Sequence, residues 1–506
     1  MRNPENSSLH DLFIFDLANN HQGDMDHAKR IIAGVAEVVA KHGVRGALKF
    51  QFRHIPTFIH PDFVDRKDVK HIPRFIETAL SAKQYEELAD FIRDHGLLTM
   101  STPFDETSVG LLMDLDLDFM KVASCSAGDW PLLERIAEEE KPIVASTGGL
   151  SIGKIDALVH FLEERAKQFA IMHCVAIYPT PPAKLNLNQI SLFKHRYRNV
   201  PIGWSTHEDQ DATEPIQIAF AKGAELFERH VGLATKKHKL NAYSSSPEQL
   251  DRWIAAYKLA VEMVGVEGRA PASLEETDSL KSLARGVYAK AALKKGQKIK
   301  REDVFFAMPI QEEQLSSGSW RESMKADRNY KVNEPLAEAL ASYEPSNEQI
   351  LSQIMLQAHG MLNEGRITVN ENSGIELSHH YGLERFREFG CVIVDCVNRN
   401  YCKKIILMLP RQKHPYHFHK RKEETFQLLH GDLEVELDGQ SHKMKIGETL
   451  LIKPNAWHKF HTLHGAIFEE ISTTHYNDDS FYEDERIAKR PREARKTLIQ
   501  KATGSL

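Results

Sequence analysis

Short apolar runs alternate with helical patterns over the first 230 residues of the chain. The runs are almost continuously apolar, which is typical of parallel strands that are covered on both faces. Between two of them, segment 28–43 places apolar residues at helical spacing and ends in a glycine, which marks a helix stop. The eight runs cover residues 13–18, 46–52, 97–102, 119–124, 142–147, 169–174, 201–206 and 225–230.

Eight strand–helix units in this length predict a closed (β/α)8 TIM barrel, so the expected fold class is α/β with a barrel domain at 1–270. A doubly wound open sheet is the competing interpretation. It usually carries a glycine-rich phosphate turn after the first strand. The segment FDLANNHQG at 15–23 does not have the G-x-G-x-x-G spacing, which favours the barrel.

The pattern changes after the barrel. Residues 280–342 contain short strands and turns, which indicates a small separate domain. A polar helical connector is expected at 344–365, and from residue 366 short strands alternate with turns in the manner of an all-β sandwich. We therefore place a third domain at 343–506, with the connector at its start.

Composition narrows the class of protein. The chain has 506 residues, 42% of them apolar, which is enough for two to four domains. Its formal net charge of -6 argues against a nucleic-acid partner, because proteins that bind nucleic acids usually carry a surplus of basic residues on one face. Five scattered cysteines without a C-x-x-C pair indicate reduced intracellular thiols. The start of the chain lacks a signal-peptide pattern, and no stretch approaches the roughly 20 apolar residues of a membrane span, so we expect a cytoplasmic protein.

Polar side chains follow the predicted strands, at the end of a barrel where chemistry takes place. Lysines and serine hydroxyls suit phosphate and carboxylate groups. His207 and His230, on neighbouring strands, suit a divalent metal ion. A lone lysine or serine at a strand end is more often structural, but polar ends on all eight strands predict a site for a phosphorylated small molecule. In strand order, the set comprises Asp16, Asn20, His21, Lys49, Gln51, Ser101, Thr102, Lys121, Ser124, Ser146, Thr147, His173, Tyr178, Ser205, Thr206, His207, Glu228, Arg229 and His230.

These segments resemble, in order, the motif series of the N-acetylneuraminate (sialic acid) synthase family. The matching motifs are NNHQGDMDHAKRII, KFQF, STPFD, KVAS, ASTGGLS, HCVAIYPTP, GWSTHE and FERH. The segment ARGVYAKAALKKGQKIKREDV is similar to the antifreeze-protein-like (β-clip) domain that follows the barrel in that family. The resemblance spans roughly residues 10–340 and implies that 280–342 is such a domain.

The resemblance implies a condensation of phosphoenolpyruvate with the aldehyde of an open-chain sugar, with Mn or Mg as cofactor and phosphate as a product. It implies that phosphoenolpyruvate is bound by Lys49, Lys121, Ser124, Ser146 and Ser205, with Thr102 completing the substrate-binding set. It implies that His207 and His230 hold the metal and that Tyr178 and Asn20 line the sugar pocket. With Asp16, the residues Tyr178, His207 and His230 form the expected catalytic set. The family also forms homodimers in which the small domain covers the partner's barrel mouth, and we expect the same here.

Several positions depart from the family pattern, and all belong to the half of the site that handles the sugar and proton transfer. Asp16 replaces a Glu, Ser126 an acid, Ala176 an Asn, Leu240 and Asn241 an Asp-His pair, and Met308 an Arg. We infer an acceptor other than N-acetylmannosamine. Loss of condensing activity is the alternative.

A second set of candidate ligands lies near the C-terminus. His417 and His419, two residues apart, point to one face of a strand, with Glu424 on the next strand and His458 on a later one. Three histidines and one glutamate suit a divalent Zn, Mn, Fe or Ni ion. The two segments that carry them, HPYHFHKRKEETFQLLHG and GETLLIKPNAWH, resemble the two-part signature of cupins. We expect Glu423 to face solvent, and His414, His461 and His464 to be other than ligands.

The reaction of the cupin domain stays open at this point. The segment KRKEET resembles the D-lyxose isomerase type of sugar-binding cupin. The leading hypothesis is a synthase of a nonulosonic-acid-like 3-deoxy-ulosonic acid with an attached metal cupin that binds a sugar. A bifunctional chain whose cupin isomerises a sugar, and a non-condensing sugar-binding or regulatory protein, are the alternatives.

Overall fold

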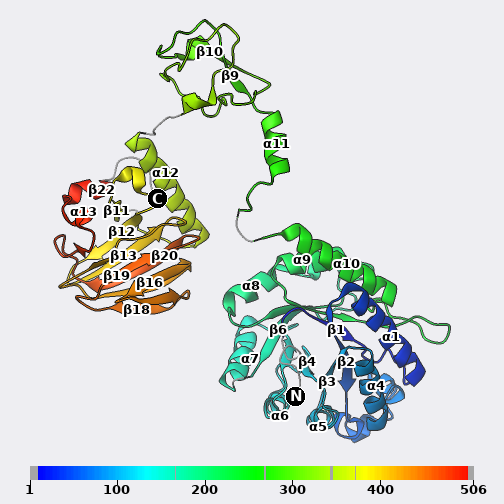
Figure 1. Ribbon diagram of the computed structural model, residues 1–506. Coiled ribbons are helices and arrows are strands. Elements are labelled where there is room, and N and C mark those ends of the chain that lie inside the picture. The colour runs from blue at the N-terminus through cyan, green and yellow to red at the C-terminus, as the bar shows by residue number, and fades with distance from the viewer. Residues whose placement is uncertain (1–8, 166, 267–268, 342–345, 371, 500–506) are drawn as a thin grey trace. The chain divides into compact units, whose positions relative to one another are not determined.

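The computed structural model describes residues 9–165, 167–266, 269–341, 346–370 and 372–499 (Figure 1). The chain divides into two compact units, Met1–Pro271 and Ala272–Leu506, and each is described by itself. No helix among the described residues is both long and apolar enough to cross a membrane.

The first unit is a closed barrel of eight parallel strands in sequence order. It closes where β1 pairs with β8, with Leu12 opposite Leu226 and Asp16 opposite His230. This confirms the barrel and excludes the open sheet. The strands are β1 (Leu12–Asp16), β2 (Arg45–Phe52), β3 (Leu98–Pro103), β4 (Phe119–Val122), β5 (Ile143–Ser146), β6 (Phe169–Cys174), β7 (Ile202–Thr206) and β8 (Leu226–His230).

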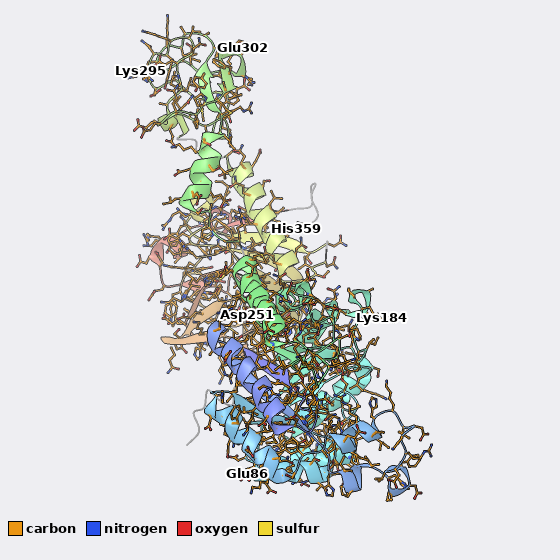
Figure 2. The ribbon with its side chains drawn as sticks, turned by 90° about the vertical axis from the view of Figure 1, so that its right-hand side faces the viewer. Glu86, Lys184, Asp251, Lys295, Glu302 and His359 are labelled. Carbon is orange, nitrogen blue, oxygen red and sulfur yellow. The ribbon has the colours of Figure 1, made fainter. Side chains whose placement is uncertain are left out.

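Helices surround the barrel and bury their apolar faces against it (Figure 1). In the first helix, the side chain of Asp24 caps the start by accepting from the His27 N–H, and Gly43 ends it with a φ of 60°. Asp251 connects the last barrel helix to the first, with contacts of 2.8 Å to Lys41 and 2.7 Å to His42. Asp251 and Glu86, which lies on α4, are labelled in Figure 2. The helices are α1 (Met25–His42), α2 (Ile55–Phe58), α3 (Ile72–Glu77), α4 (Ala82–Asp94), α5 (Glu106–Asp114), α6 (Trp130–Ala137), α7 (Ile152–Glu164), α8 (Asn188–Arg196), α9 (Glu214–Ala221) and α10 (Pro247–Val264).

The barrel interior is layered, because side chains two residues apart on a strand share a face. A separate apolar cluster forms one layer, and the residues two positions further along six of the strands are polar and buried. These pairs are Ile14 and Asp16, Ala47 and Lys49, Met100 and Thr102, Phe119 and Lys121, Val144 and Ser146, and Leu226 and Glu228. The apolar layer therefore fills the barrel toward the amino ends of the strands, and the polar layer lies toward their carboxyl ends.

The second unit begins with α11 (Leu274–Ser282) and a small domain. Its two-stranded antiparallel sheet joins β9 (Gly286–Ala289) to β10 (Val304–Ala307). Val287, Leu293, Ile299 and Tyr330 belong to its own apolar core.

The rest of this unit consists of α12 (Asn347–Glu364) and two antiparallel sheets, which confirms the predicted all-β region. The sheet orders are β18-β15-β20-β13-β12-β11-β22 and β17-β16-β19-β14-β21. Phe426, Phe460 and Phe468 belong to the apolar core that both sheets supply. The strands are β11 (Gly374–Ser378), β12 (Cys391–Asn398), β13 (Tyr401–Met408), β14 (His417–Phe418), β15 (Glu424–Gly431), β16 (Leu433–Leu437), β17 (Gln440–Met444), β18 (Thr449–Ile452), β19 (His458–His461), β20 (Ala466–Thr473), β21 (Phe481–Tyr482) and β22 (Lys496–Ile499); helix α13 (Glu485–Ala488) precedes the last.

Candidate functional site

Two lysines and two carboxylates form a buried network inside the barrel. Lys49 Nζ lies 2.9 Å from Asp16 Oδ2 and 2.9 Å from Glu228 Oε1. Lys121 Nζ lies 2.9 Å from Glu228 Oε2. Glu228 therefore joins both lysines; the sequence places it among the polar strand ends, but we assigned it no role there. Its place in FERH, two residues before His230 on the same face of β8, is the signal that could have assigned it to the site.

The opposite charges in this network stabilise the ionised forms of the two carboxylates. Burial opposes ionisation, but the two lysines hold the pKa of Glu228 well below its ordinary value. Burial likewise opposes the charge of Asp16, yet Lys49 and His230 lower its pKa. Burial and the nearby Lys49 lower the pKa of Lys121 against the effect of Glu228. An incoming anion is therefore favoured here, because it stabilises the charged form of Lys121.

Hydroxyl groups surround Lys121 and Lys49. Lys121 Nζ donates to Ser146 Oγ, and Lys49 Nζ donates to Thr102 Oγ1 at 3.1 Å. Ser124 Oγ accepts from the Gly148 N–H at 3.0 Å. Ser124 and Ser205 both hydrogen-bond the buried thiol of Cys174, so the structure brings the four expected hydroxyl-bearing residues and both lysines together.

His207 and His230 face each other with ring centroids 5.2 Å apart. His207 Nδ1 lies 3.1 Å from the Val175 carbonyl oxygen, which leaves its Nε2 for another partner. His230 Nδ1 is buried without a hydrogen-bond partner among the described residues and lies 3.5 Å from Asp16 Oδ2. Burial lowers the pKa of His207 to about 3 and lowers that of His230. Both rings are thus neutral, the form that binds metal ions, and the pair fits a divalent ion.

The two residues expected to line the sugar pocket differ in their surroundings. Tyr178 is 52% exposed, and its ring lies 4.2 Å from that of His207. Both amide hydrogens of Asn20 are engaged, with Val231 O at 2.8 Å and Ser244 Oγ at 3.0 Å. Asn20 thus supports the loop after β8, and a contact between Asn20 and the sugar stays a prediction.

The positions that depart from the family pattern are spread over both units. Ser126 is buried near the end of β4, and Asn241 Nδ2 donates to Asn20 Oδ1 at 3.3 Å. Met308 lies in the second unit and is 54% exposed there.

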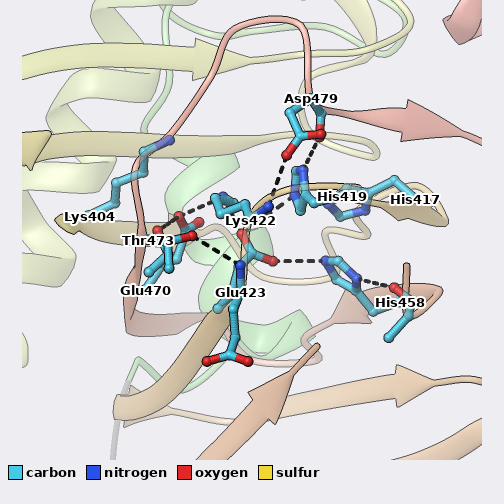
Figure 3. Close-up of polar contacts among 12 residues, drawn as sticks. Lys404, His417, His419, Lys422, Glu423, His458, Glu470, Thr473 and Asp479 are labelled. Carbon is cyan, nitrogen blue, oxygen red and sulfur yellow. Dashed lines mark hydrogen bonds and ion pairs between the residues drawn. The ribbon is translucent and has the colours of Figure 1, made fainter. Parts of the chain in front are cut away.

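The C-terminal sandwich holds a cluster of buried histidines (Figure 3). Ligand atoms of His417, His419 and His458 lie within 4.8 Å of one another. Glu424 Oε1 lies 3.5 Å from His419 Nε2, and Glu424 Oε2 lies 3.3 Å from His458 Nε2. The structure therefore brings together all four expected cupin ligands.

Hydrogen bonds orient these rings toward a common point. His417 Nδ1 faces the Pro415 carbonyl at 3.0 Å, His458 Nδ1 faces that of Ala456 at 3.1 Å, and His419 Nδ1 faces that of Asp479. Each Nε2 is left as a potential ligand. Glu424 Oε2 and His458 Nε2 are buried atoms without a hydrogen-bond partner among the described residues. Orphaned polar atoms that face each other fit a divalent cation between them.

Two buried charged residues beside this cluster were missed from the sequence. Lys422 Nζ contacts Glu424 Oε1 and lies 2.8 Å from Glu470 Oε1. Burial opposes the charge of Lys422, but these two carboxylates raise its pKa. Lys422 precedes Glu424 by two residues, so same-face spacing could have found it. Glu470 lies on β20, more than 40 residues away, and no local pattern marks it.

Asp479, also missed, anchors the segment between His419 and Glu424. Its carboxylate accepts from the backbone N–H groups of Lys420 at 3.0 Å, Arg421 at 3.1 Å and Lys422 at 3.0 Å. Its carbonyl oxygen accepts from His419, so one residue fixes both a ligand and the loop beside it (Figure 3).

The remaining residues near the cluster lie as expected. Glu423 is exposed, and His461 and His464 are partly or largely exposed. His414 is buried behind His417, with ring centroids 4.5 Å apart. A cavity of about 50 Å³ adjoins the ligands, and its lining includes Lys404, Lys422, Glu470, His475, Tyr482 and Lys496.

Comparison with known proteins finds a family match in each of the two units. The NeuB family matches residues 37–268, and the cupin domain family matches residues 404–469. A solved structure from Chromobacterium violaceum, assigned to spore coat polysaccharide biosynthesis, is 42% identical with a TM-score of 0.61, and the match covers 65% of this chain and 98% of that one.

Two named synthases are similar to the chain. N,N'-diacetyllegionaminic acid synthase of Campylobacter jejuni is 25% identical over 349 residues, which are 65% of this chain and 99% of that protein. N-acetylneuraminate-9-phosphate synthase of Mus musculus is 28% identical over 262 residues, which are 51% of this chain and 72% of that protein. The chain therefore belongs to the NeuB family and carries a cupin domain in its C-terminal part.

Proposed function

We propose that the barrel condenses phosphoenolpyruvate with an aldose to give a nonulosonic-acid-like 3-deoxy-ulosonic acid and phosphate. The observation that carries the proposal is the buried Lys49–Glu228–Lys121 network, surrounded by hydroxyls, in the same barrel as the neutral pair His207 and His230. The similar synthases of N,N'-diacetyllegionaminic acid and N-acetylneuraminate 9-phosphate support it.

Phosphoenolpyruvate carries a phosphate and a carboxylate, and the polar layer of the barrel suits both. Lys49 and Lys121 supply the positive charge, and the hydroxyls supply hydrogen bonds without further charge. The reaction forms a bond between C3 of phosphoenolpyruvate and the aldehyde carbon. Water adds at C2, and phosphate leaves with the bridging oxygen, so the sum is one ulosonic acid and one phosphate. The cations stabilise the negative charge that grows on the leaving phosphate.

His207 and His230 would hold Mn or Mg, which when bound supplies a Lewis acid for the aldehyde oxygen. Asp16 faces His230 and Lys49, so it orients one metal ligand and one anion-binding residue. Partial burial raises the pKa of Tyr178, so its hydroxyl stays protonated and can donate to the acceptor sugar.

Phosphate release from phosphoenolpyruvate, measured with Mn and a panel of aldoses, tests this function. We expect release with at least one aldose, and a Lys121→Met variant that loses most of kcat/KM for phosphoenolpyruvate. Lys141→Met is the matched control, because Lys141 lies before β5, outside the buried network, and pairs with the exposed Asp116. Absence of release with every aldose would sink the condensation and leave a binding or regulatory protein.

For the cupin domain we propose that His417, His419, Glu424 and His458 hold a divalent Zn, Mn, Fe or Ni ion and that the domain binds a sugar. The buried pair Lys422 and Glu470 beside the ligands favours a second function, isomerisation of that sugar. An aldose–ketose isomerisation moves a proton between neighbouring carbons, and Glu470 is a carboxylate placed to accept and return it. The bound ion would supply a Lewis acid for the sugar oxygens.

Isomerisation is tested without phosphoenolpyruvate, by incubating the metal-loaded full chain with aldoses in deuterated water. We expect ketose formation with deuterium exchange, and loss of both in Glu470→Gln. Glu469→Gln is the control, because Glu469 is the neighbouring residue and pairs with Lys403 instead. A sugar that binds the holoprotein without ketose or exchange would assign the cupin to binding or regulation.

We further propose that the protein acts in the cytoplasm as a homodimer in which the small domain of one chain covers the barrel mouth of its partner. Light scattering at micromolar concentration tests the dimer. A monomer at every concentration would contradict it.

A further inference from the structure

Arg53 continues the inward face of β2 beyond the end of the strand. Lys49 and Gln51 occupy that face, and Arg53 follows at the same spacing of two residues. Lys49 belongs to the network proposed to bind phosphoenolpyruvate. Arg53 is thus the next positive group outward from that network on the same strand.

A chain of hydrogen bonds links Arg53 to the reacting end of the site. Arg53 Nη2 donates to Gln51 Oε1 at 3.1 Å, and Gln51 Nε2 donates to Asp16 Oδ2 at 3.1 Å. Asp16 in turn contacts Lys49 and faces His230. The Gln51 amide therefore separates the Arg53 guanidinium from the buried network and holds it at the rim.

Aromatic rings fix the guanidinium in place. Arg53 Cζ lies 4.0 Å from the centre of the Phe75 ring and 3.8 Å from that of Phe104. Phe58 lies further away, at 5.8 Å. Contact with ring faces leaves the N–H groups at the edge of the guanidinium free to bind an anion in a forked geometry.

No carboxylate forms an ion pair with Arg53 among the described residues, although Asp16 and Asp105 lie near enough to favour its charge. Among the described residues, its guanidinium makes one hydrogen bond, to a neutral amide, and no ion pair, and its Nε is buried without a partner. The buried Arg229 shows the usual arrangement, with Glu208 at 2.6 Å, Ser245 and a backbone carbonyl as partners. A partly buried, always charged group without a direct ion-pair partner favours the binding of an anion from outside the chain.

We propose that Arg53 binds an anionic group of the acceptor, so that the barrel accepts aldoses bearing a phosphate or a carboxylate remote from the aldehyde. The inference rests on the proposed condensation, since it assigns the second substrate of that reaction. The phosphate and carboxylate of phosphoenolpyruvate are matched by Lys49, Lys121 and the hydroxyls deeper in the barrel. The acceptor sugar is the remaining substrate that can neutralise the positive charge of Arg53.

The test compares mannose, mannose 6-phosphate and mannuronic acid as acceptors for phosphate release by the full chain with Mn and saturating phosphoenolpyruvate. We expect at least one anionic sugar to exceed mannose in kcat/KM. Arg53→Gln should raise KM for that sugar about 10- to 100-fold, the range for hydrogen bonds to charged groups, and leave KM for phosphoenolpyruvate unchanged. Arg53→Lys should recover part of the loss, because it keeps the charge without the fork.

Arg66→Gln is the matched control, because Arg66 is an exposed arginine of the same β2–α4 connection that already pairs with Asp68. It should behave as the wild type. Equal kcat/KM for mannose and both anionic sugars would overturn the proposal. So would an Arg53→Gln variant whose only kinetic change is in KM for phosphoenolpyruvate, which would assign Arg53 to that substrate.

Calorimetry separates this proposal from the condensation itself. If no sugar releases phosphate, the condensation fails, and binding of the same three sugars to the phosphoenolpyruvate-saturated protein decides the role of Arg53. Tighter binding of an anionic sugar than of mannose, lost in Arg53→Gln and kept in Arg66→Gln, supports an anion site. Equal binding of the three sugars contradicts it.

Discussion

At the residue scale, single side chains in both units position the groups that we propose to bind ligands. Glu228 keeps two buried lysines compatible with each other, and Asp479 fixes a histidine and a loop in the cupin domain. Neither belongs to the expected ligand sets. Replacing either residue therefore tests a positioning role and not a direct contact with the ligand.

Replacing Asp479 with Ala should lower the affinity of the cupin domain for its metal about 10- to 100-fold, the usual effect of losing a partner that orients a ligand. The three backbone N–H groups of residues 420–422 lose their acceptor, so the loop beside His419 loosens. Competition with a chelator measures the change. Asp478→Ala is the control, because Asp478 is an exposed neighbour that pairs with the Arg421 side chain. Equal losses in both variants would contradict the assignment.

Replacing Glu228 with Gln should destabilise the barrel by about 3–5 kcal/mol, the typical cost of breaking a buried ion pair on one side. Lys49 and Lys121 then lack their shared carboxylate. Inorganic phosphate that binds the folded state stabilises it. Phosphate should stabilise this variant more than the wild type, because it replaces the negative charge that the two lysines have lost. Urea denaturation with and without phosphate measures both effects, with Glu225→Gln, a more exposed salt bridge, as the control. A variant that phosphate stabilises no better than the wild type would count against anion binding at these lysines.

At the element scale, the strand pattern accounts for most of what the sequence could predict. Period-two alternation places Lys49 after Ala47 and Lys121 after Phe119, so strand ends alone predict a polar layer. The same rule pairs His417 with His419. It cannot pair Lys422 with Glu470 or His419 with Asp479, because these contacts join segments 48 and 60 residues apart whose register depends on the folded sandwich. Arg53 was missed for a different reason: an arginine after a strand looks like solvated charge until the rings of Phe75 and Phe104 are seen to cover it.

The loop after β5 makes a further prediction at this scale. A Cβ on Gly148 would lie 2.8 Å from Ser124 Oγ and 3.2 Å from the Cys174 carbonyl oxygen. Gly148→Ala should therefore displace Ser124 and raise KM for phosphoenolpyruvate, with a stability loss of about 1–3 kcal/mol from overpacking. Gly153→Ala, in the first turn of α7 with nothing within 4 Å of the new Cβ, should keep KM and slightly raise stability. Steady-state kinetics and thermal unfolding of both variants check this, and an unchanged KM in Gly148→Ala would remove Ser124 from the binding set.

At the scale of the whole molecule, the two units have separate cores and separate candidate sites. A ligand that binds only one folded unit stabilises that unit by mass action. Thermal unfolding of the full chain should thus show one transition that rises with phosphoenolpyruvate or phosphate, and another that rises with Zn or Mn and falls on chelation. His458→Ala should abolish the metal-dependent rise and keep the phosphate-dependent one, because His458 lies only in the cupin cluster. Lys121→Met should do the reverse. If either variant abolished both responses, the two sites would be coupled, and the expectation of two separate transitions would be wrong.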